Sequence, residues 1–463
     1  MCQVDEDDLE KVSAPAPVLT LADKKQICVK CGEEAVIHLR DEDSKCGKCF
    51  IHSVIQKFRT VLSKYQISKC RERILVAVTG GAASSTLLQL IQEATGASHH
   101  SRLYFVPVVI HIDESIGDSS ASDTSSSERI QSVLAVAEKI NQSWDRLYST
   151  SDMVFANETE PCSFTLPEDT GMSKQHCSYR NRLHSLLDSV RSSTAKEELI
   201  KLLRLKLLKR IGKQLAITKI FVGDCVDRLA VQLITNTALG KGKHLPIDLG
   251  YVDSRDPDFA IIRPLKEITM KEILMFSQLN HVATLQGSST SEQKSTVFGM
   301  TRSFVSDLQQ EFPQTVTTLC KTADKLAVSK IVGNSRQDLL CDICAGPVDS
   351  SASSNSSCTA EGSIVLSLKL TSSVDMENAF SQDNTCARTD AACQSEDKES
   401  GNCCQTSKKP VANLCYFCRW MLSEMKDPEL LPATFSMPAS LENRRQQMRE
   451  SIQEFLLDDA EDV

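Results

Sequence analysis

Apolar runs alternate with amphipathic segments between residues 74 and 279, and this alternation predicts the main fold. Runs of the kind that form buried parallel strands occupy residues 74–81, 102–113, 219–224 and 259–265. Helical periodicity follows these runs, in segments 84–93, 128–141, 226–236 and 269–279. Pro107 is awkward for a central strand, because proline lacks the N–H that a strand ladder uses. The alternation predicts an α/β fold with a doubly wound, mostly parallel sheet.

Composition divides the remaining chain into smaller regions. We expect a disordered acidic leader (1–23), a cysteine-rich module with a helix from Cys49 to about Lys69 (24–70), the α/β domain (71–285), a helical region (286–340), a second cysteine module (341–420) interrupted by a disordered Ser-rich insertion (348–410), and a polar helical, acidic tail (421–463). No run of about 18 apolar residues occurs, so no membrane span is predicted.

Charge and cysteine usage narrow the class of protein. A composition with 41% hydrophobic and 24% charged residues is typical of a soluble globular protein. The formal net charge of −9 speaks against a protein coated in basic charge, although a local basic face remains open. The acidic start, MCQVDEDDLEKV, lacks the apolar segment of a secretory signal. We therefore expect a cytoplasmic protein, in which the 19 cysteines indicate metal ligation or sulfur chemistry before disulfides.

Two cysteine pairs near the N-terminus have the spacing of a metal site. They consist of Cys28, Cys31, Cys46 and Cys49, each pair of the form C-x-x-C, with 14 residues between the pairs. Two such pairs can close a tetrahedral site of four sulfurs, which suits zinc. Gly32 and Gly47 each follow a cysteine and are expected to supply the backbone freedom of the two turns. The alternative is four unpaired structural thiols.

A second set of cysteine pairs lies far downstream. It consists of Cys341, Cys344, Cys415 and Cys418, with 70 residues between the pairs. Most of that interval is the Ser-rich segment, and the entropic cost of closing a flexible loop grows only slowly with its length. We therefore predict a second zinc site here.

A glycine pair follows the first apolar run. Thr79, Gly80, Gly81, Ser84 and Ser85 lie between the expected strand and the next helix. Backbone N–H groups of such a turn, together with the helix N-terminus, can bind an anion. The segment resembles the PP-loop of the N-type ATP-pyrophosphatases, whose pattern is Ser-Gly-Gly-x-Asp-Ser. Members of that family adenylate a carbonyl oxygen and expel pyrophosphate.

The loop departs from that pattern at its charged positions. Ala83 stands at the Asp position, and Ala82 stands where the tRNA-thiolating branch often has Lys. Loss of a cation and a carboxylate removes the charge that would organise phosphates and metal. The sequence therefore predicts a loop whose backbone turn survives without its chemistry.

Further segments also resemble the tRNA-thiolating branch. Gly223 and Asp227 match its Thr-Gly-His-Asn-Ala-Asp-Asp segment, and residues 263–265 match its Arg-Pro-Leu. Catalytic members carry cysteines in the α/β domain that handle sulfur or an iron–sulfur cluster. The counterpart here is Cys177, with no second cysteine three residues away. One thiolate cannot hold a cluster of the usual three- or four-cysteine type.

Together these features resemble the cytoplasmic tRNA 2-thiolation protein 2 family, the non-catalytic PP-loop subunits of wobble-uridine thiolation complexes. The resemblance implies a HUP-like α/β domain with zinc-ribbon modules at both ends. It also implies a catalytic PP-loop partner, which would bind and use ATP, and sulfur from a ubiquitin-like thiocarboxylate carrier. The implied product is 2-thiouridine at the wobble position of tRNAs for Lys, Glu and Gln.

Two groups of basic residues are candidates for contact with tRNA. The first group is Lys206, Lys209, Arg210 and Lys213, which share one face at helical spacing. The second group is Lys57, Arg59, Lys69, Arg71 and Arg73, which join the first cysteine module to the α/β domain. Both can follow RNA phosphates, and both can equally be solvated surface.

Two other functions stay open at this point. The chain can be an active PP-loop ligase, an adenylating tRNA sulfurtransferase, with an unusual arrangement of metal; Ala83 speaks against this. It can also be a zinc-dependent protein scaffold that makes no contact with RNA.

Overall fold

The computed structural model describes most of the α/β region and both cysteine modules. The described residues are 27–38, 44–65, 71–96, 103–114, 123–157, 159–165, 174–256, 258–285, 295–326, 340–348, 414–432 and 435. The predicted leader, Lys69, nearly all of the Ser-rich insertion and the tail beyond residue 435 lie outside them.

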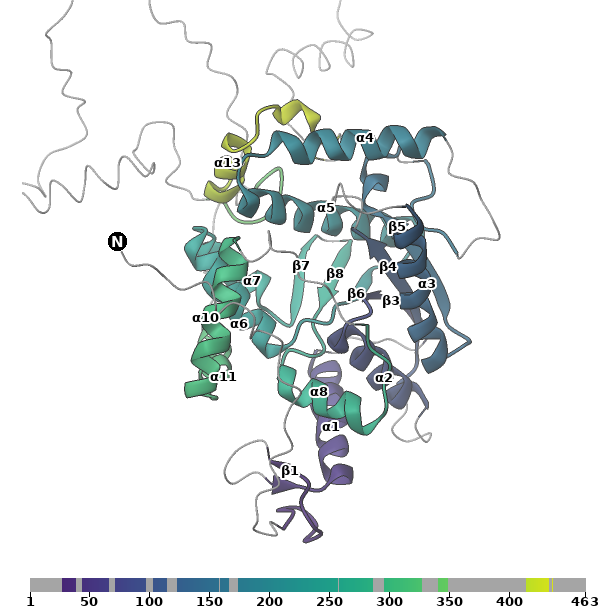
Figure 1. Ribbon diagram of the computed structural model, residues 1–463, viewed down its shortest axis with the longest axis vertical. Coiled ribbons are helices and arrows are strands. Elements are labelled where there is room, and N and C mark those ends of the chain that lie inside the picture. Colours follow the sequence, from purple (N-terminus) through teal and green to yellow (C-terminus); the bar gives the residue numbers. More distant parts are fainter. Residues whose placement is uncertain are drawn as a thin grey trace, which may run out of the picture.

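A six-stranded sheet forms the centre of the described structure (Figure 1). Its strands are β3 (Glu72–Val78), β4 (Phe105–Asp113), β5 (Asp145–Thr150), β6 (Lys219–Phe221), β7 (Val252–Asp256) and β8 (Phe259–Ile262). Their order across the sheet is β5-β4-β3-β6-β8-β7, and only β7 is antiparallel to its neighbour. The predicted doubly wound, mostly parallel sheet is therefore confirmed.

The strand order reverses between β3 and β6. From β3 the chain proceeds outward to β4 and β5, and it then returns to place β6 on the other side of β3. Ligands of open α/β sheets bind outside the carboxyl ends of the strands at such a point. Thr79–Gly81 follow β3 and Gly223 follows β6, so both predicted loop segments lie at this edge.

Helices cover both faces of the sheet. The first face packs against α1 (Gly47–Lys64), α2 (Ala82–Gly96), α3 (Asp123–Ile140) and α8 (Met270–Leu279). The second face packs against α5 (Ser193–Gln214), beyond which lie η3 (Ser151–Phe155) and α4 (Lys174–Ser189). Alternate side chains of β3 serve the two layers, because Val76 belongs to the first apolar cluster and Leu75 to the second.

Further helices extend this body. They are α6 (Val226–Ala238), η4 (Gly242–His244), α7 (Leu245–Asp248), α10 (Val297–Glu311), α11 (Thr315–Ala323), α13 (Tyr416–Ser423) and η5 (Pro428–Leu430). Helices α10 and α11 pack on α6 at one side of the body, and α13 lies beside α4 and α5 (Figure 1). A short ladder of β1 (Ile37–His38) and β2 (Ser44–Lys45) lies at the free end of α1. Each helix in the described part of the chain is too short or too polar to cross a bilayer.

The sequence analysis did not predict two strands of the six-stranded sheet, β5 and β7, nor the short ladder of β1 and β2. Strand β5 begins with Asp145 and Arg146, so it shows no apolar run. Strand β7 is the antiparallel edge strand, and its Asp253 is bound by Arg255 within the same strand. Both lie at edges of the sheet, where continuous hydrophobic character is not needed.

Two local expectations also change. Helix α1 begins at Gly47, two residues before the predicted start, so Gly47 is helical and does not supply a left-handed turn. Pro107 does lie in β4, an internal strand, but β4 pairs with β5 only from Val108 onward. Proline is tolerated there because only β3 flanks it.

Candidate metal centres and nucleotide loop

The first cysteine module is a tight turn followed by a helix N-terminus. Cys28 and Cys31 lie in a turn in which the N–H of Cys28 donates to the carbonyl of Glu33 at 2.7 Å. Gly32 adopts the left-handed φ of +77°, as its predicted role requires. Cys46 is the N-cap of α1, and its sulfur accepts the backbone N–H of Cys49.

The second module repeats this local structure residue for residue. Cys341 donates its N–H to the carbonyl of Gly346 at 2.8 Å, and Ala345 takes the left-handed place of Gly32 with φ +54°. Cys415 is the N-cap of α13 and accepts the N–H of Cys418. Isolated bridges close the two turns at matching positions, 27 with 34 and 340 with 347.

Both sets of four sulfurs converge. Within each set the sulfur atoms all lie within 4.8 Å of one another. The Sγ atoms of Cys31 and Cys46 are 3.5 Å apart, and those of Cys344 and Cys415 are 3.7 Å apart. Tetrahedral zinc with Zn–S bonds of about 2.3 Å needs sulfurs about 3.8 Å apart. The structure therefore brings together all eight predicted cysteines in two arrangements that fit a tetrahedral metal ion.

The first cysteine of each set is disposed to ionise. A backbone hydrogen bond from Cys46 lowers the pKa of Cys28 to about 6. A side-chain hydrogen bond with Cys344 lowers the pKa of Cys341 to about 6. Hydrogen bonds with neighbouring sulfurs raise the pKa of Cys49 and of Cys344, so a metal held by all four thiolates of a set must displace protons from these thiols.

The two modules differ in how they join the body. Cys31 is exposed at the free end of α1, whereas Cys418 is fully buried. Phe417 and Cys418 share an apolar cluster with Leu186 of α4 and Leu199 of α5. The first module therefore projects from the body, and the second forms part of its core (Figure 1).

His244 contacts the second module and was not singled out from the sequence. A Cβ on Gly346 would lie 2.4 Å from the His244 ring, so only glycine allows this approach. Burial is the largest single effect and opposes protonation of His244, but the hydrogen bond with Cys415 and the charges of Cys415 and Asp248 together outweigh it and raise the pKa of the imidazole. An imidazole that hydrogen-bonds a ligand sulfur supports the ligand from outside the metal shell. His244 could not have been identified from the sequence, because it is not part of a metal-ligand spacing pattern.

Replacing Ala345 with glycine is expected to raise the free energy of unfolding by about 0.5–1 kcal/mol. The left-handed backbone costs alanine roughly 1–2 kcal/mol, and relief of this strain exceeds the added entropy of glycine in the unfolded chain. Gly32→Ala is the reverse change at the matching place and should destabilise its module. Chemical denaturation of both variants checks this, and equal signs for the two would contradict it.

The glycine loop between β3 and α2 is closed by its own side chains. The hydroxyl of Ser84 accepts the N–H of Thr79 at 3.3 Å and donates to the carbonyl of Gly81 at 3.0 Å. Ser85 donates its hydroxyl to the carbonyl of Gly80 at 3.3 Å. The N–H of Thr79 is therefore already bound to a side chain of the loop itself.

Leu285 covers the same loop from outside. Its N–H donates to the carbonyl of Gly80 at 2.8 Å, and its side chain would lie 2.8 Å from a Cβ on Gly80. Gly80 has the left-handed φ of +79°. On the other side, Gly223 approaches the backbone N of Ser84 so closely that a Cβ there would lie 3.3 Å from it. Side chain and backbone thus crowd Gly80 and Gly223, whereas a Cβ on Gly81 would meet only Oγ1 of Thr79, at 3.7 Å.

The other remnants of the motifs are engaged within the protein. Asp227 accepts the N–H of Met270 at 2.5 Å and the amide of Gln309 at 2.7 Å, so it ties α6 to α8 and α10. Asp224, at the His position of the pattern, pairs with Arg228 and with Arg263, both at 3.4 Å. These residues form internal contacts at the place where a working site would bind ligand.

Cys177 is exposed on α4 and belongs to neither group of convergent ligands in the described part of the chain. Three other cysteines of the described residues are buried thiols, Cys162, Cys225 and Cys320. Burial raises the pKa of Cys162, that of Cys225 to about 11 and that of Cys320 to about 12. Raised pKa values disfavour the thiolate near neutral pH, so these thiols are poorly suited to sulfur transfer or to a cluster.

Most of the predicted basic face of α5 is engaged inside the protein. Lys206 lies over the Phe435 ring, and Lys209 pairs with Asp256 at 3.2 Å. Arg210 donates to backbone carbonyls at the end of η3, including that of Ala156 at 2.6 Å. Lys213 is exposed. Contact of this face with tRNA stays a prediction, because three of its four cations already interact with other groups of the protein.

In the second basic group some side chains bind other groups of the protein and others are exposed. Lys57 binds Glu272 at 2.7 Å and so joins α1 to α8, and Arg73 lies 3.4 Å from Asp145. Arg59 contacts the carbonyl of Glu93 at 3.5 Å. Arg71 is exposed, with a left-handed backbone at the start of β3.

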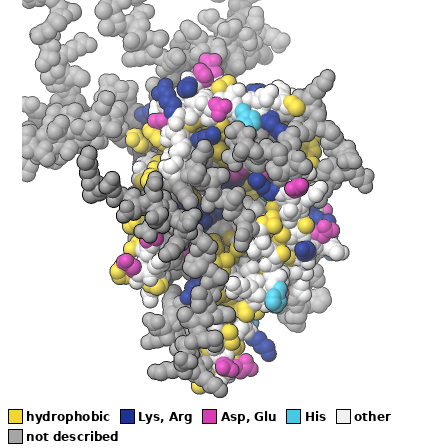
Figure 2. Space-filling model, viewed as in Figure 1, with side chains coloured by type: hydrophobic (Ala, Val, Ile, Leu, Met, Phe, Trp, Pro, Cys, Tyr) yellow, Lys and Arg dark blue, Asp and Glu magenta, His cyan; other side chains and the backbone are white. Residues whose placement is uncertain are grey.

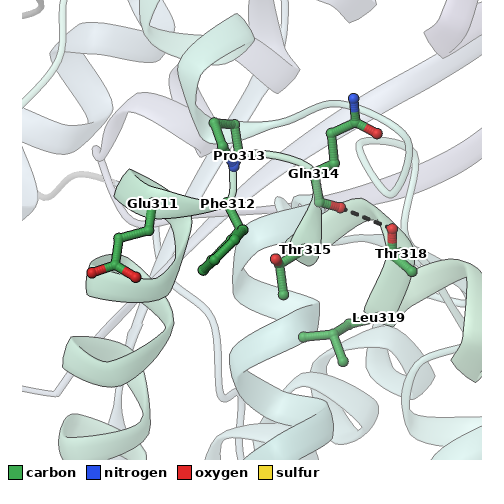
Figure 3. A pocket seen from close by; sticks show the side chains of 7 residues that line it. All are labelled: Glu311, Phe312, Pro313, Gln314, Thr315, Thr318 and Leu319. Atoms are coloured by element: carbon green, nitrogen blue, oxygen red, sulfur yellow. Dashed lines mark hydrogen bonds between the residues drawn. The ribbon is translucent and has the colours of Figure 1, made fainter.

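A shallow groove of about 440 Å³ opens between the end of α10 and the start of α11 (Figure 3). Phe312 and Leu319 are among its lining side chains, and the hydroxyl of Thr318 donates to the carbonyl of Gln314. Glu311 is its single acidic residue. One carboxylate with hydroxyls and apolar groups makes no acid–base pair, so the groove offers no catalytic site.

Comparison with known proteins gives consistent matches. A family model described as cytoplasmic tRNA 2-thiolation protein 2 matches residues 296–420, which include the second cysteine module. A Danio rerio protein of that name is 30% identical, with 100% of both chains covered. The Homo sapiens protein of that name is 26% identical, covering 100% of this chain and 99% of its own.

Among solved structures, the U34-tRNA thiolase NcsA from Methanococcus maripaludis with its [4Fe-4S] cluster is similar with a TM-score of 0.47. It is 16% identical, and the match covers 66% of this chain and 92% of that chain. The sequence relatives decide the assignment, because the Danio rerio protein aligns over the whole of both chains. This chain belongs to the cytoplasmic tRNA 2-thiolation protein 2 family.

Proposed function

We propose that this chain is the non-catalytic subunit of a cytoplasmic tRNA-thiolation complex. In this complex a catalytic PP-loop subunit binds and uses ATP, and a ubiquitin-like thiocarboxylate carrier supplies sulfur. The product is 2-thiouridine at the wobble position of tRNAs for Lys, Glu and Gln. The names of the relatives support a cytoplasmic role in tRNA thiolation.

The closed glycine loop is the observation that carries the non-catalytic role. An adenylating enzyme needs free N–H groups and charge for the phosphates of ATP. Here Ser84 takes the N–H of Thr79, Leu285 covers Gly80, and alanine stands at 82 and 83. Binding of ATP in this loop would break these contacts, and the loop has no cation that could bind the phosphates in their place. This speaks against the alternative of an active ligase.

Zinc is the metal that both four-sulfur groups would hold. Four thiolates at tetrahedral distances close the coordination shell and leave no position for water or substrate. Such sites stabilise a fold and do not catalyse. The eight cysteines would therefore serve the structure of the subunit, and Cys177 stays a candidate thiol without an assigned step.

The test is thiolation of a wobble-uridine tRNA by this chain alone, by the catalytic PP-loop subunit alone, and by the two together. We expect full ATP-dependent thiolation only from the mixture. Within the mixture, a charge change in the partner's PP-loop should abolish ATP turnover, whereas Ala82→Lys with Ala83→Asp in this chain should leave its rate unchanged. Leu285 and Ser84 still close the loop in that double variant.

The outcomes separate the candidate functions. Adenylation of tRNA by this chain alone would reject the proposal in favour of an active ligase. If the assembled complex binds no tRNA and the catalytic subunit is fully active alone, the zinc-dependent scaffold without RNA contact is the better account.

A further inference from the structure

Positive charge is concentrated in one stretch of this acidic chain. Residues 44–73 contain eight lysines or arginines against a single acidic residue, Glu72, whereas the whole chain carries a formal net charge of −9. The acidic residues of the first cysteine module, at 33–34 and 41–43, precede the stretch. A local excess of this size attracts a polyanion even when the whole protein is acidic.

Most of this stretch is α1, which contains no acidic residue. Its buried side includes Phe50, Val54 and Phe58. Lys48, His52 and Arg59 lie on the opposite side at spacings of four and seven residues, so they form one stripe along the helix. From Lys48 to Arg59 the stripe is about 16 Å long at 1.5 Å per residue.

The cysteine module adds a further cation to the stripe. Lys30, in the turn between Cys28 and Cys31, places its Nζ 3.5 Å from Nδ1 of His52. Lys48 is exposed in the first turn of α1. The metal-type turn thus holds Lys30 against the same side of the helix that carries Lys48 and His52.

This stripe lies on a part of the molecule that a large ligand can reach. The first module stands away from the sheet at the end of α1, and basic side chains are visible along its edge, with acidic ones at its tip (Figures 1 and 2). The basic face of α5 is more fully engaged, because Lys209 and Arg210 bind groups of the protein itself. Only Lys213 of that face is exposed. In the stripe Lys30 and Lys48 are exposed, and Arg59 at its far end contacts the carbonyl of Glu93.

We propose that the stripe formed by Lys30, Lys48 and His52, with Arg59 farther along α1, binds the phosphate backbone of tRNA. The inference rests on the proposed function, because it identifies the surface through which this subunit holds the substrate of the complex. Lysines and an arginine neutralise phosphates, and a histidine beside them can hydrogen-bond a phosphate oxygen, without reading bases. The contact is therefore electrostatic and indifferent to tRNA sequence.

The test compares two double variants in the assembled complex with the catalytic subunit. Lys30→Glu with Lys48→Glu changes the stripe, and Lys321→Glu with Lys325→Glu makes the same charge change at exposed positions in and just beyond α11. The dissociation constant for a wobble-uridine tRNA is measured over a range of salt concentrations. Zinc content and sedimentation of each complex report whether the module and the assembly are intact.

For the stripe variant we expect a dissociation constant raised roughly tenfold or more at low salt. The slope of log K against log salt should fall by about 2, because two phosphates are no longer neutralised by a lysine. The α11 variant should change neither. An unchanged slope in the stripe variant would overturn the inference.

Two further outcomes are informative. A stripe variant that no longer binds the catalytic subunit but retains tRNA affinity would also overturn the inference, because the surface would then bind an acidic protein. If the unmodified complex binds no tRNA, the proposed function itself fails, which is distinguishable from failure of the stripe alone.

Discussion

Replacing Cys418 with serine is expected to lower the free energy of unfolding of the α/β body by more than about 3 kcal/mol. Metal binding to a structural four-ligand site contributes roughly 10–16 kcal/mol in small zinc domains, and loss of one thiolate removes much of it. Cys418 is fully buried in the cluster that joins α13 to α4 and α5. Without the metal, the apolar contacts of Phe417 and Met421 with the leucines of those helices would open as well.

Cys49→Ser is the matched control, because Cys49 occupies in the first module the place that Cys418 occupies in the second. The first module stands at the free end of α1, so the sheet should retain most of its stability when this site loses its metal. Hydrogen exchange of the amides of α4 and α5 distinguishes the two variants. Their protection should fall in Cys418→Ser and persist in Cys49→Ser. Equal loss of protection would show that the depth of burial does not decide the role of each site.

The sequence predicted the sheet and the cysteine centres because both have a local signature. Parallel strands buried on both faces produce apolar runs such as residues 74–78, and a metal turn needs two cysteines three residues apart. Strands β5 and β7 lie at the sheet edges, and they were not predicted because their polar residues interrupt the apolar run. The helix start at Gly47 was missed because the sulfur of Cys46 caps α1 in place of the usual oxygen of serine or aspartate.

Contacts between distant segments could not be read from the sequence. Leu285 lies more than two hundred residues from Gly80, and nothing in its neighbours indicates that it covers the loop. His244 likewise reaches Cys415 across 171 positions, which only the docking of α13 brings about. The basic face of α5 has the expected spacing, but its partners come from β7 and η3. A pattern of charges along one helix does not show which of them the rest of the fold will use.

Replacing Asp227 with alanine is expected to lower the free energy of unfolding by about 2–4 kcal/mol. Its carboxylate accepts two hydrogen bonds, from the N–H of Met270 and the amide of Gln309, and each bond to a charged group contributes about 1.5–3 kcal/mol. Asp227→Asn retains the shape of the side chain and should lose about half as much. Asp307→Asn, on the exposed face of α10, is the control and should leave the unfolding transition unchanged.

The Asp227 variants also test whether this aspartate, which matches the motif of the tRNA-thiolating branch, still acts in catalysis. In a working PP-loop site, removal of the corresponding aspartate would abolish ATP turnover while the fold stayed stable. Here Asp227 of α6 accepts the first N–H of α8 and binds Gln309 of α10, so stability should fall while the thiolation rate of the assembled complex persists at temperatures where the variant is folded. A stable Asp227→Asn variant that no longer supports thiolation would contradict this and would return the residue to a role in catalysis. The retained aspartate would then reflect ligand binding, and the closed loop would have to open in the complex.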